Sequence, residues 1–151
     1  MHSKIKLINQ NSASFRLKGR IDEIGHLELI LEELSSLWGL DDKIKFKLNL
    51  VLEELITNII FHGFENNKED NYILLDLGLS ENEIEICIKD NAKEFNPLLM
   101  ESEPAIKPIE EQEIGGLGIH LVKNMTVNMN YNRNNDLNQL TLSIILEDGN
   151  K

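Results

Sequence analysis

The spacing of hydrophobic residues predicts two long helices in the first part of the chain. From residue 24 to residue 38, apolar side chains recur every three or four positions, which gathers them on one face of a helix. They are Ile24, Leu27, Leu31, Leu34 and Trp38. Gly39 is typical of a helix end. Either Asp41 or Asp42 can then cap a second helix, which runs to about Gly63.

Alternation of apolar and polar residues predicts a β-sheet. This spacing places the apolar side chains on one face of each strand and leaves the other face wet. The predicted strands are one or two within residues 3–18, and then 73–79, 84–88, 127–133 and 139–146. A sheet with one wet face is covered by helices on one side only. The pattern therefore predicts an α/β fold, a two-layer α/β sandwich with a mixed, mainly antiparallel sheet.

Length and composition favour a single domain over residues 1–151 and limit its partners. The net charge of −11 excludes nucleic acid and an anionic membrane as main partners, because no basic stripe offsets it. No apolar run is long enough to span a bilayer, and the N-terminus lacks the apolar stretch of a signal peptide. The single cysteine, Cys87, cannot form an internal disulfide, so a cytoplasmic location is expected.

The second predicted helix carries two polar residues beside its buried stripe. Glu54 and Asn58 lie one turn apart, so both can reach a cavity at the edge of the helix–sheet interface, whereas Glu53 points toward water. An amide oxygen such as that of Asn58 suits Mg²⁺. The Glu54 carboxylate can accept a proton from an attacking hydroxyl. A helix with an ordinary polar flank is the alternative that these residues alone leave open.

Asp90 follows the strand at 84–88. It lies two positions after Ile88 along the strand, so its side chain is predicted to lie on the same face, the one covered by helices. A carboxylate at the rim of a core needs a hydrogen-bond donor. The exocyclic amine of adenine is one such donor, and the backbone of the turn at Asn91-Ala92 is the other that the sequence offers.

A glycine cluster follows a long loop. Residues 91–117 hold all three prolines, and a loop this long inside a compact domain is usually functional or disordered. Gly115, Gly116 and Gly118 permit the close approach of a phosphate, and a third helix from about Gly118 directs free N–H groups at an anion. The cluster is not a Walker loop, and alone it is equally typical of a hinge. In their order along the chain, the acid, the amide, the second acid and the glycines make ATP the leading ligand.

Three segments resemble the motifs of a known family. Residues 51–64 resemble the N-box of the bacterial anti-sigma-factor serine/threonine kinases, which belong to the gyrase, heat-shock-ATPase and histidine-kinase ATP-binding superfamily. Residues 90–97 resemble the first glycine box of these kinases, and residues 115–122 resemble the second.

The resemblance implies a Bergerat-type ATP-binding fold and a role for each matching residue. Glu54 would be the base that activates the attacking hydroxyl, Asn58 would bind Mg²⁺, and Asp90 would read adenine. Residues 98–117 would form the ATP lid. The residues that would line the nucleotide site are Asn58, His62, Asp90, Ala92, Gly115, Gly116 and Gly118.

The resemblance also implies protein partners. Members of this family phosphorylate a serine on a small STAS-domain anti-anti-sigma protein, many sequester a sigma factor, and they commonly form homodimers. The chain is therefore expected to be an ATP-dependent protein-serine kinase that controls a sigma factor by partner switching, with ATP and Mg²⁺ as cofactors.

The first glycine box departs from the family pattern. Glycines are usual two and four residues after its aspartate, where this chain has Ala92 and Glu94. Alanine disfavours a positive φ, and Glu94 adds negative charge near the nucleotide. The alternative hypothesis is therefore a degenerate, non-catalytic module that binds a partner and holds ATP weakly or structurally. The ATPase part of a histidine kinase is a third hypothesis, disfavoured because no phosphoacceptor-helix domain precedes these motifs.

Overall fold

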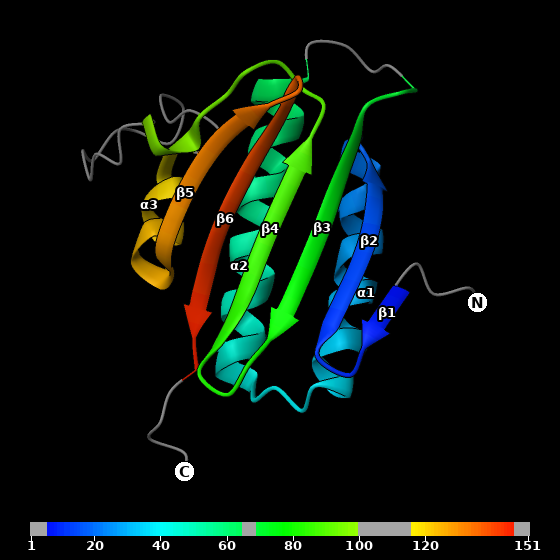
Figure 1. Cartoon of the computed structure of the whole chain (residues 1–151), viewed down its shortest axis with the longest axis vertical. Coiled ribbons are helices and arrows are strands. Elements are labelled where there is room, and N and C mark those ends of the chain that lie inside the picture. Colours follow the sequence, from blue (N-terminus) through cyan, green and yellow to red (C-terminus); the bar gives the residue numbers. More distant parts are fainter. Residues whose placement is uncertain (1–5, 65–68, 100–115, 147–151) are drawn as a thin grey trace.

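The structure, a computed structural model, describes residues 6–64, 69–99 and 116–146. These residues form one sheet with helices on one of its faces (Figure 1). The strands are β1 (Lys6–Asn9), β2 (Ser12–Lys18), β3 (Tyr72–Leu79), β4 (Glu83–Asp90), β5 (Val127–Asn134) and β6 (Leu137–Ile145). The helices are α1 (Ile24–Leu37), α2 (Asp42–Asn58) and α3 (Gly116–Met125), with short 3-10 turns at Ile21–Glu23 and Pro97–Leu99.

The predicted two-layer α/β sandwich is confirmed. The strands lie in the order β1-β2-β3-β4-β6-β5. The sheet was predicted to be mixed and mainly antiparallel, and the first part needs correction, because every pairing between its described strands is antiparallel. The face toward the helices is apolar, and Leu17 of β2, Leu75 of β3 and Leu52 of α2 are completely buried in the layer between them. Burial of this apolar layer is what holds helices and sheet together.

Helix ends follow the signals in the sequence with two refinements. Gly39 has a φ of +61°, the left-handed conformation that glycine adopts after a helix. Asp41, not Asp42, caps α2, because its side-chain Oδ1 accepts a hydrogen bond from the backbone N–H of Ile44 at 2.8 Å. α3 begins at Gly116, slightly earlier than the predicted start at Gly118. No helix in the described ranges is both long and apolar enough to cross a membrane.

A π-helical turn at Ile59–Gly63 extends α2. The backbone N–H of Phe64 closes this turn on the carbonyl oxygen of Ile59 at 3.1 Å. Such turns often occur at functional sites, because one extra residue per turn changes the direction of the side chains that follow. Here it falls directly after Asn58 and carries His62.

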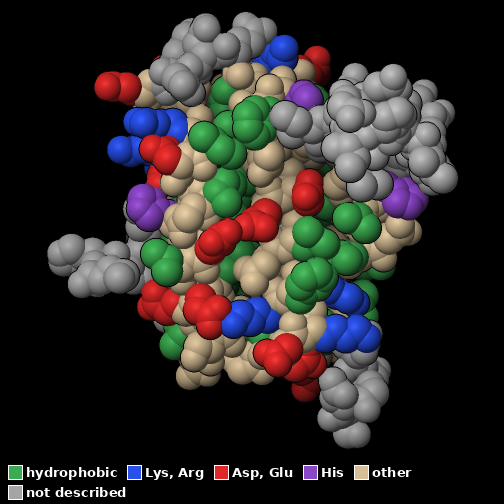
Figure 2. Space-filling model, turned by 180° about the vertical axis from the view of Figure 1, so that it is seen from behind, with side chains coloured by type: hydrophobic (Ala, Val, Ile, Leu, Met, Phe, Trp, Pro, Cys, Tyr) green, Lys and Arg blue, Asp and Glu red, His purple; other side chains and the backbone are tan. Residues whose placement is uncertain are grey.

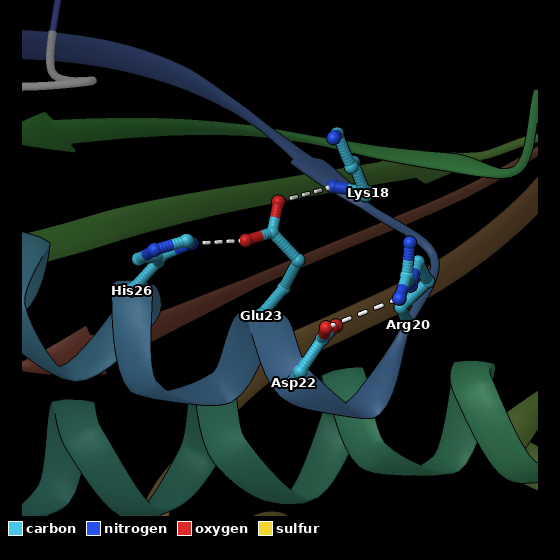
Figure 3. Close-up of polar contacts among 5 residues, drawn as sticks. All are labelled: Lys18, Arg20, Asp22, Glu23 and His26. Atoms are coloured by element: carbon cyan, nitrogen blue, oxygen red, sulfur yellow. Dashed lines mark hydrogen bonds and ion pairs between the residues drawn. The ribbon is translucent and has the colours of Figure 1, made fainter. Parts of the chain in front are cut away.

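Glu23 fixes the connection from β2 to α1 (Figure 3). Its carboxylate is buried and accepts a hydrogen bond from the backbone N–H of Lys18 at 2.9 Å, while His26 Nδ1 pairs with its other oxygen. Beside it, Arg20 and Asp22 form an exposed ion pair at 3.3 Å. A buried carboxylate needs such partners, and these hold the start of α1 against the sheet.

Candidate functional site

The end of α2 places the Asn58 amide inside the protein. Asn58 is 1% exposed, and neither its Nδ2 nor its Oδ1 has a hydrogen-bond partner within the described residues. A buried polar group without a partner costs about 1–3 kcal/mol of folding free energy. Its presence in a native fold points to a ligand, and an amide oxygen here fits the Mg²⁺ that the sequence predicts.

Asn58 and Asp90 line one pocket between α2 and the sheet. The other residues around it are Leu55, Ile59, Phe95, Pro97, Tyr131, Asn138 and Leu140. Apolar walls with a few polar groups are typical of a small-molecule site. The cavity measures about 20 Å³, which holds roughly one water molecule. This volume is smaller than a nucleotide base, so side chains that line the pocket would have to move before a base could enter.

Asp90 combines deep burial with hydrogen bonds on one oxygen. It is 3% exposed, and its Oδ1 accepts from the Ala92 N–H at 3.0 Å and from Asn138 Nδ2 at 2.8 Å. Burial raises the pKa of Asp90, while the bonds from Asn138 and Ala92 and the charge of Arg133 oppose that rise. Within the described residues Oδ2 accepts no hydrogen bond, so it stays available to a donor in the pocket. The backbone turn, one of the two donors proposed from the sequence, takes Oδ1 together with Asn138, and this leaves Oδ2 as the oxygen that could accept from a ligand.

Glu54 lies against the start of α3. A Cβ added to Gly118 would come within 1.9 Å of Glu54 Oε2 and 2.5 Å of its carboxyl carbon. These distances require glycine at position 118 for as long as the Glu54 carboxylate keeps its place. The N-box residue and the second glycine box, far apart in the sequence, are therefore in contact.

Replacing Gly118 by alanine is expected to displace the Glu54 carboxylate while leaving the fold intact. The new methyl group meets the end of a flexible side chain, which can rotate away. Because Glu54 is the proposed base, we expect phosphate transfer to a protein substrate to fall by about tenfold or more, as expected for a misplaced catalytic group. The thermal midpoint should change by less than about 2 °C. Unchanged transfer by a folded Gly118→Ala protein would show that Glu54 does not act from this position.

The first glycine box packs against the end of α2. A Cβ added to Gly63 would lie 2.9 Å from the Ala92 Cβ, so this glycine leaves room for the alanine that replaces the usual glycine. Next to this contact the His62 ring stacks on Phe95, with 6.1 Å between centroids and 23° between planes. Glu94 is exposed and does not line the pocket.

The glycine cluster is described in part. Gly116 begins α3 and Gly118 is buried in its first turn. Gly115 and most of the predicted ATP lid lie outside the described residues, so their predicted roles stay predictions.

Comparison with known proteins identifies the family. The model of the histidine kinase-like ATPase domain matches residues 18–144, which is most of the chain. This chain belongs to the histidine kinase-like ATPase domain family. The resemblance seen in the motifs is thereby confirmed at the level of the family.

Curated relatives of this ATPase-domain chain carry names of protein kinases and anti-sigma factors. It is 28% identical over 101 residues to serine/threonine-protein kinase BtrW of Bordetella bronchiseptica, which covers 67% of this chain and 70% of that protein. It is 24% identical over 119 residues to serine-protein kinase RsbW of Oceanobacillus iheyensis, with 76% and 75% covered. It is 32% identical over 72 residues to an anti-sigma F factor of Clostridium botulinum, with 48% and 50% covered.

Asn138, Tyr131 and Arg133 also belong to this candidate site, although no sequence motif marks them. Asn138 is buried at the start of β6 and lines the pocket together with Tyr131. Arg133 donates to the backbone carbonyl of Ala92 at 2.9 Å. A signal for Asn138 existed, because it has the parity of Leu140, which places a polar side chain on the covered face of its strand.

The prediction that Glu53 points toward water needs correction. Its side chain is partly buried, and it shares a hydrogen bond with Glu28 of α1 across a groove between α1 and α2. Burial, this bond and the charges of Glu28 and Glu54 raise the pKa of Glu53 to about 7. Helix periodicity gave the direction of the side chain correctly relative to α2, but it could not show that α1 lies alongside.

The Glu53–Glu28 pair predicts a pH-dependent stability. Because the folded-state pKa is raised from 4.5, the stability that neutral Glu53 contributes is present below pH 4.5 and is lost as pH rises through about 7. Glu53→Gln keeps a hydrogen-bonding group and cannot ionise. At pH 8 we expect the free energy of unfolding of this variant to exceed that of the wild type by about 1 kcal/mol, a small value because solvent screens the pair. This corresponds to a thermal midpoint that is higher by about 3 °C.

The measurement is thermal unfolding followed by circular dichroism at pH 5 and pH 8. At pH 5 the two proteins should melt together, since Glu53 is then mostly protonated in the folded wild type. Glu81→Gln, at an exposed turn between β3 and β4, is the matched control and should show no such difference between the two pH values. A Glu53→Gln advantage of equal size at both pH values would contradict the raised pKa.

Proposed function

We propose that this chain, acting as one domain over residues 1–151, is an ATP-dependent protein-serine kinase and anti-sigma regulatory factor. The substrate would be a serine on a STAS-domain anti-anti-sigma protein, and switching between that partner and a sigma factor would control transcription. The observation that carries the proposal is the meeting of three motifs, with Asn58 and Asp90 in one pocket and Glu54 against Gly118.

Each of these residues has chemistry that fits phosphate transfer. Asp90 Oδ2 would accept a hydrogen bond from the adenine amino group. Asn58 would supply its unpaired Oδ1 to Mg²⁺, an ion that neutralises charge developing on the phosphates when it is bound. The start of α3 would offer backbone N–H groups to the phosphates. His62, Ala92, Gly115 and Gly116 would complete the nucleotide site.

Glu54 would act on the protein substrate. Its carboxylate would accept the proton of the serine hydroxyl as that oxygen forms a bond to the γ-phosphorus and the bond to the leaving ADP breaks. The products are a phosphoserine, ADP and a proton held by Glu54. The closeness of the Glu54 carboxylate to Gly118 supports this role, because Gly118 lies in the first turn of α3, the helix that would face the phosphates.

The names of the relatives support both halves of the proposal. Two are named as serine or serine/threonine protein kinases, and a third is named as an anti-sigma factor. We extend kinase activity and sigma-factor control to this chain on that basis. A homodimer is part of the same proposal.

The helix-covered side of the molecule offers a surface for a protein partner. Hydrophobic and acidic side chains lie next to one another there (Figure 2). Large apolar side chains on α1 and α2 are exposed, Leu29 at 58% and Phe46 at 61%. Exposed apolar patches rimmed by polar residues often mark protein–protein contacts.

Transfer of radioactive phosphate from ATP to a cognate STAS-domain partner tests the proposal. We expect labelled serine in the partner, dependent on Mg²⁺. A search of the neighbouring reading frames supplies the candidate partner, a STAS protein encoded beside a sigma factor or serine phosphatase. Absence of label on every such partner, with a folded kinase that binds Mg·ATP, would reject the kinase assignment.

A binding module with weak or structural ATP binding is the second candidate. Ala92 and Glu94 in place of glycines favour it, together with the small volume of the pocket. Isothermal titration calorimetry with Mg·ATP separates the two candidates. No heat at millimolar nucleotide would favour the module and remove the kinase.

A further inference from the structure

Asn138 sits where the first glycine box meets the last two strands. It is 4% exposed, lies at the start of β6, and is in register with Asp90 on β4. It also lines the pocket that contains Asp90 and Asn58. Its amide is therefore buried at the site without belonging to any motif of the sequence.

The Asn138 side chain uses its full hydrogen-bonding capacity. Its Nδ2 donates to Asp90 Oδ1 and to the carbonyl oxygen of Lys93, both at 2.8 Å, with the Ala92 carbonyl further away at 3.5 Å. Its Oδ1 accepts from the Phe95 N–H at 3.2 Å, from Arg133 Nη1 at 3.1 Å and from the Tyr131 hydroxyl. An amide offers two donors and two acceptor lone pairs, so this one is saturated.

These bonds hold the loop that follows β4, and they come from residues of β5 and β6, which are not part of the loop. Lys93 and Phe95 are anchored through their backbone atoms to Asn138, and Arg133 adds a bond to the Ala92 carbonyl at 2.9 Å. Side-chain bonds to backbone groups constrain a loop whatever its own residues are. The loop therefore keeps a defined path although alanine and glutamate stand at its usual glycine positions.

The same amide orients the Asp90 carboxylate. With Oδ1 bonded to Asn138 Nδ2 and to the Ala92 N–H, the carboxyl group cannot rotate without breaking both bonds. This leaves Oδ2 as the acceptor for a ligand. An acceptor held in one direction matches the amino group at C6 of adenine and repels the carbonyl oxygen at C6 of guanine.

We propose that Asn138 is a positioning residue for base recognition: it orients Asp90 and holds the loop of residues 92–95 so that the pocket selects ATP over GTP. This inference rests on the proposed function. It assigns to Asn138 a role in nucleotide selection and no direct part in phosphate transfer.

The test compares Mg·ATP and Mg·GTP binding by calorimetry. Asn138→Asp keeps the shape of the side chain but replaces the donor Nδ2 by an oxygen that faces Asp90 Oδ1 and the Lys93 carbonyl. We expect Mg·ATP affinity to fall about tenfold or more, and the ratio of ATP to GTP affinity to fall with it. The matched control is Asn132→Asp at an exposed position of β5, where affinity should stay within about twofold.

A second variant and a second readout keep the outcome decisive. Asn138→Ala removes the same bonds without adding charge, and its ratio of affinities should fall as well. If either folded variant keeps the wild-type ratio, the positioning role is overturned. If neither variant folds, as judged by circular dichroism, Asn138 serves the fold and the positioning role is likewise rejected. If the wild-type protein itself binds no Mg·ATP, the proposed function fails first, and this inference fails with it.

Discussion

Glu54→Gln is expected to lower phosphate transfer to the protein partner by about 10²–10⁴-fold, the range typical of a lost general base. Glutamine keeps the shape that packs against Gly118 but cannot accept the serine proton. Binding of Mg·ATP should stay within about twofold, because Glu54 does not line the base pocket. Single-turnover transfer of labelled phosphate and calorimetry measure the two quantities separately.

The adjacent residue supplies the control for this experiment. Glu53→Gln makes the same chemical change one position away, where the side chain faces Glu28 of α1. We expect its transfer rate at pH 7 to stay within about twofold of the wild type. Transfer that survives in Glu54→Gln, or that is lost equally in both variants, would remove Glu54 as the base.

Asn58→Leu is expected to stabilise the ligand-free protein and to weaken its binding of Mg·ATP severely. Leucine has the same branched shape and no polar atoms, so it removes a buried amide whose Nδ2 and Oδ1 have no partner among the described residues. The free energy of unfolding should rise by about 1–2 kcal/mol, which raises the thermal midpoint by about 2–8 °C. Affinity for Mg·ATP should fall by at least about 10²-fold, since loss of a supporting group near a metal already costs 10–100-fold.

Urea unfolding and calorimetry measure the two effects of Asn58→Leu. Asn49→Leu is the matched control, because Asn49 also has a buried unpaired Oδ1 but lies in the groove between α1 and α2. Its Mg·ATP affinity should stay within about twofold. An Asn58→Leu protein that is less stable than the wild type and still binds Mg·ATP would show that the amide serves the fold. A gain in stability together with lost binding would show that Asn58 lowers the stability of the fold and is required for ligand binding, as is common at functional sites.

Much of the fold could be predicted from local patterns. The three- and four-residue spacing from Ile24 to Trp38 predicted α1, and alternation of apolar residues predicted β3 and β4, because each buried face imposes its own period on the sequence. Gly39 and Asp41 marked helix ends for reasons internal to the backbone. The ends of elements were harder to predict. The start of α3 was expected at about Gly118 but lies at Gly116, because glycines have no side chain that could show a hydrophobic period.

The candidate site could be predicted only through its motifs. Asn58 and Asp90 were selected because polar side chains on a covered face are unusual, and both line the pocket. Asn138 has the same parity signal but stands outside the motifs, and it was not selected. Glu53 was assigned to solvent from the periodicity of α2 alone. Its pKa of about 7 depends on Glu28, a residue of another helix.

By itself the sequence determined the helices, the strands, the two-layer class and the family, because periodicity, caps and motifs are local properties that each segment carries alone. Only the tertiary structure decided that Glu54 touches Gly118, that Asn138 saturates its hydrogen bonds around Asp90, and that Glu53 meets Glu28. Each of these contacts joins segments that are distant along the chain. Their distances follow from how the helices pack on the sheet, and this packing depends on all the buried side chains at once.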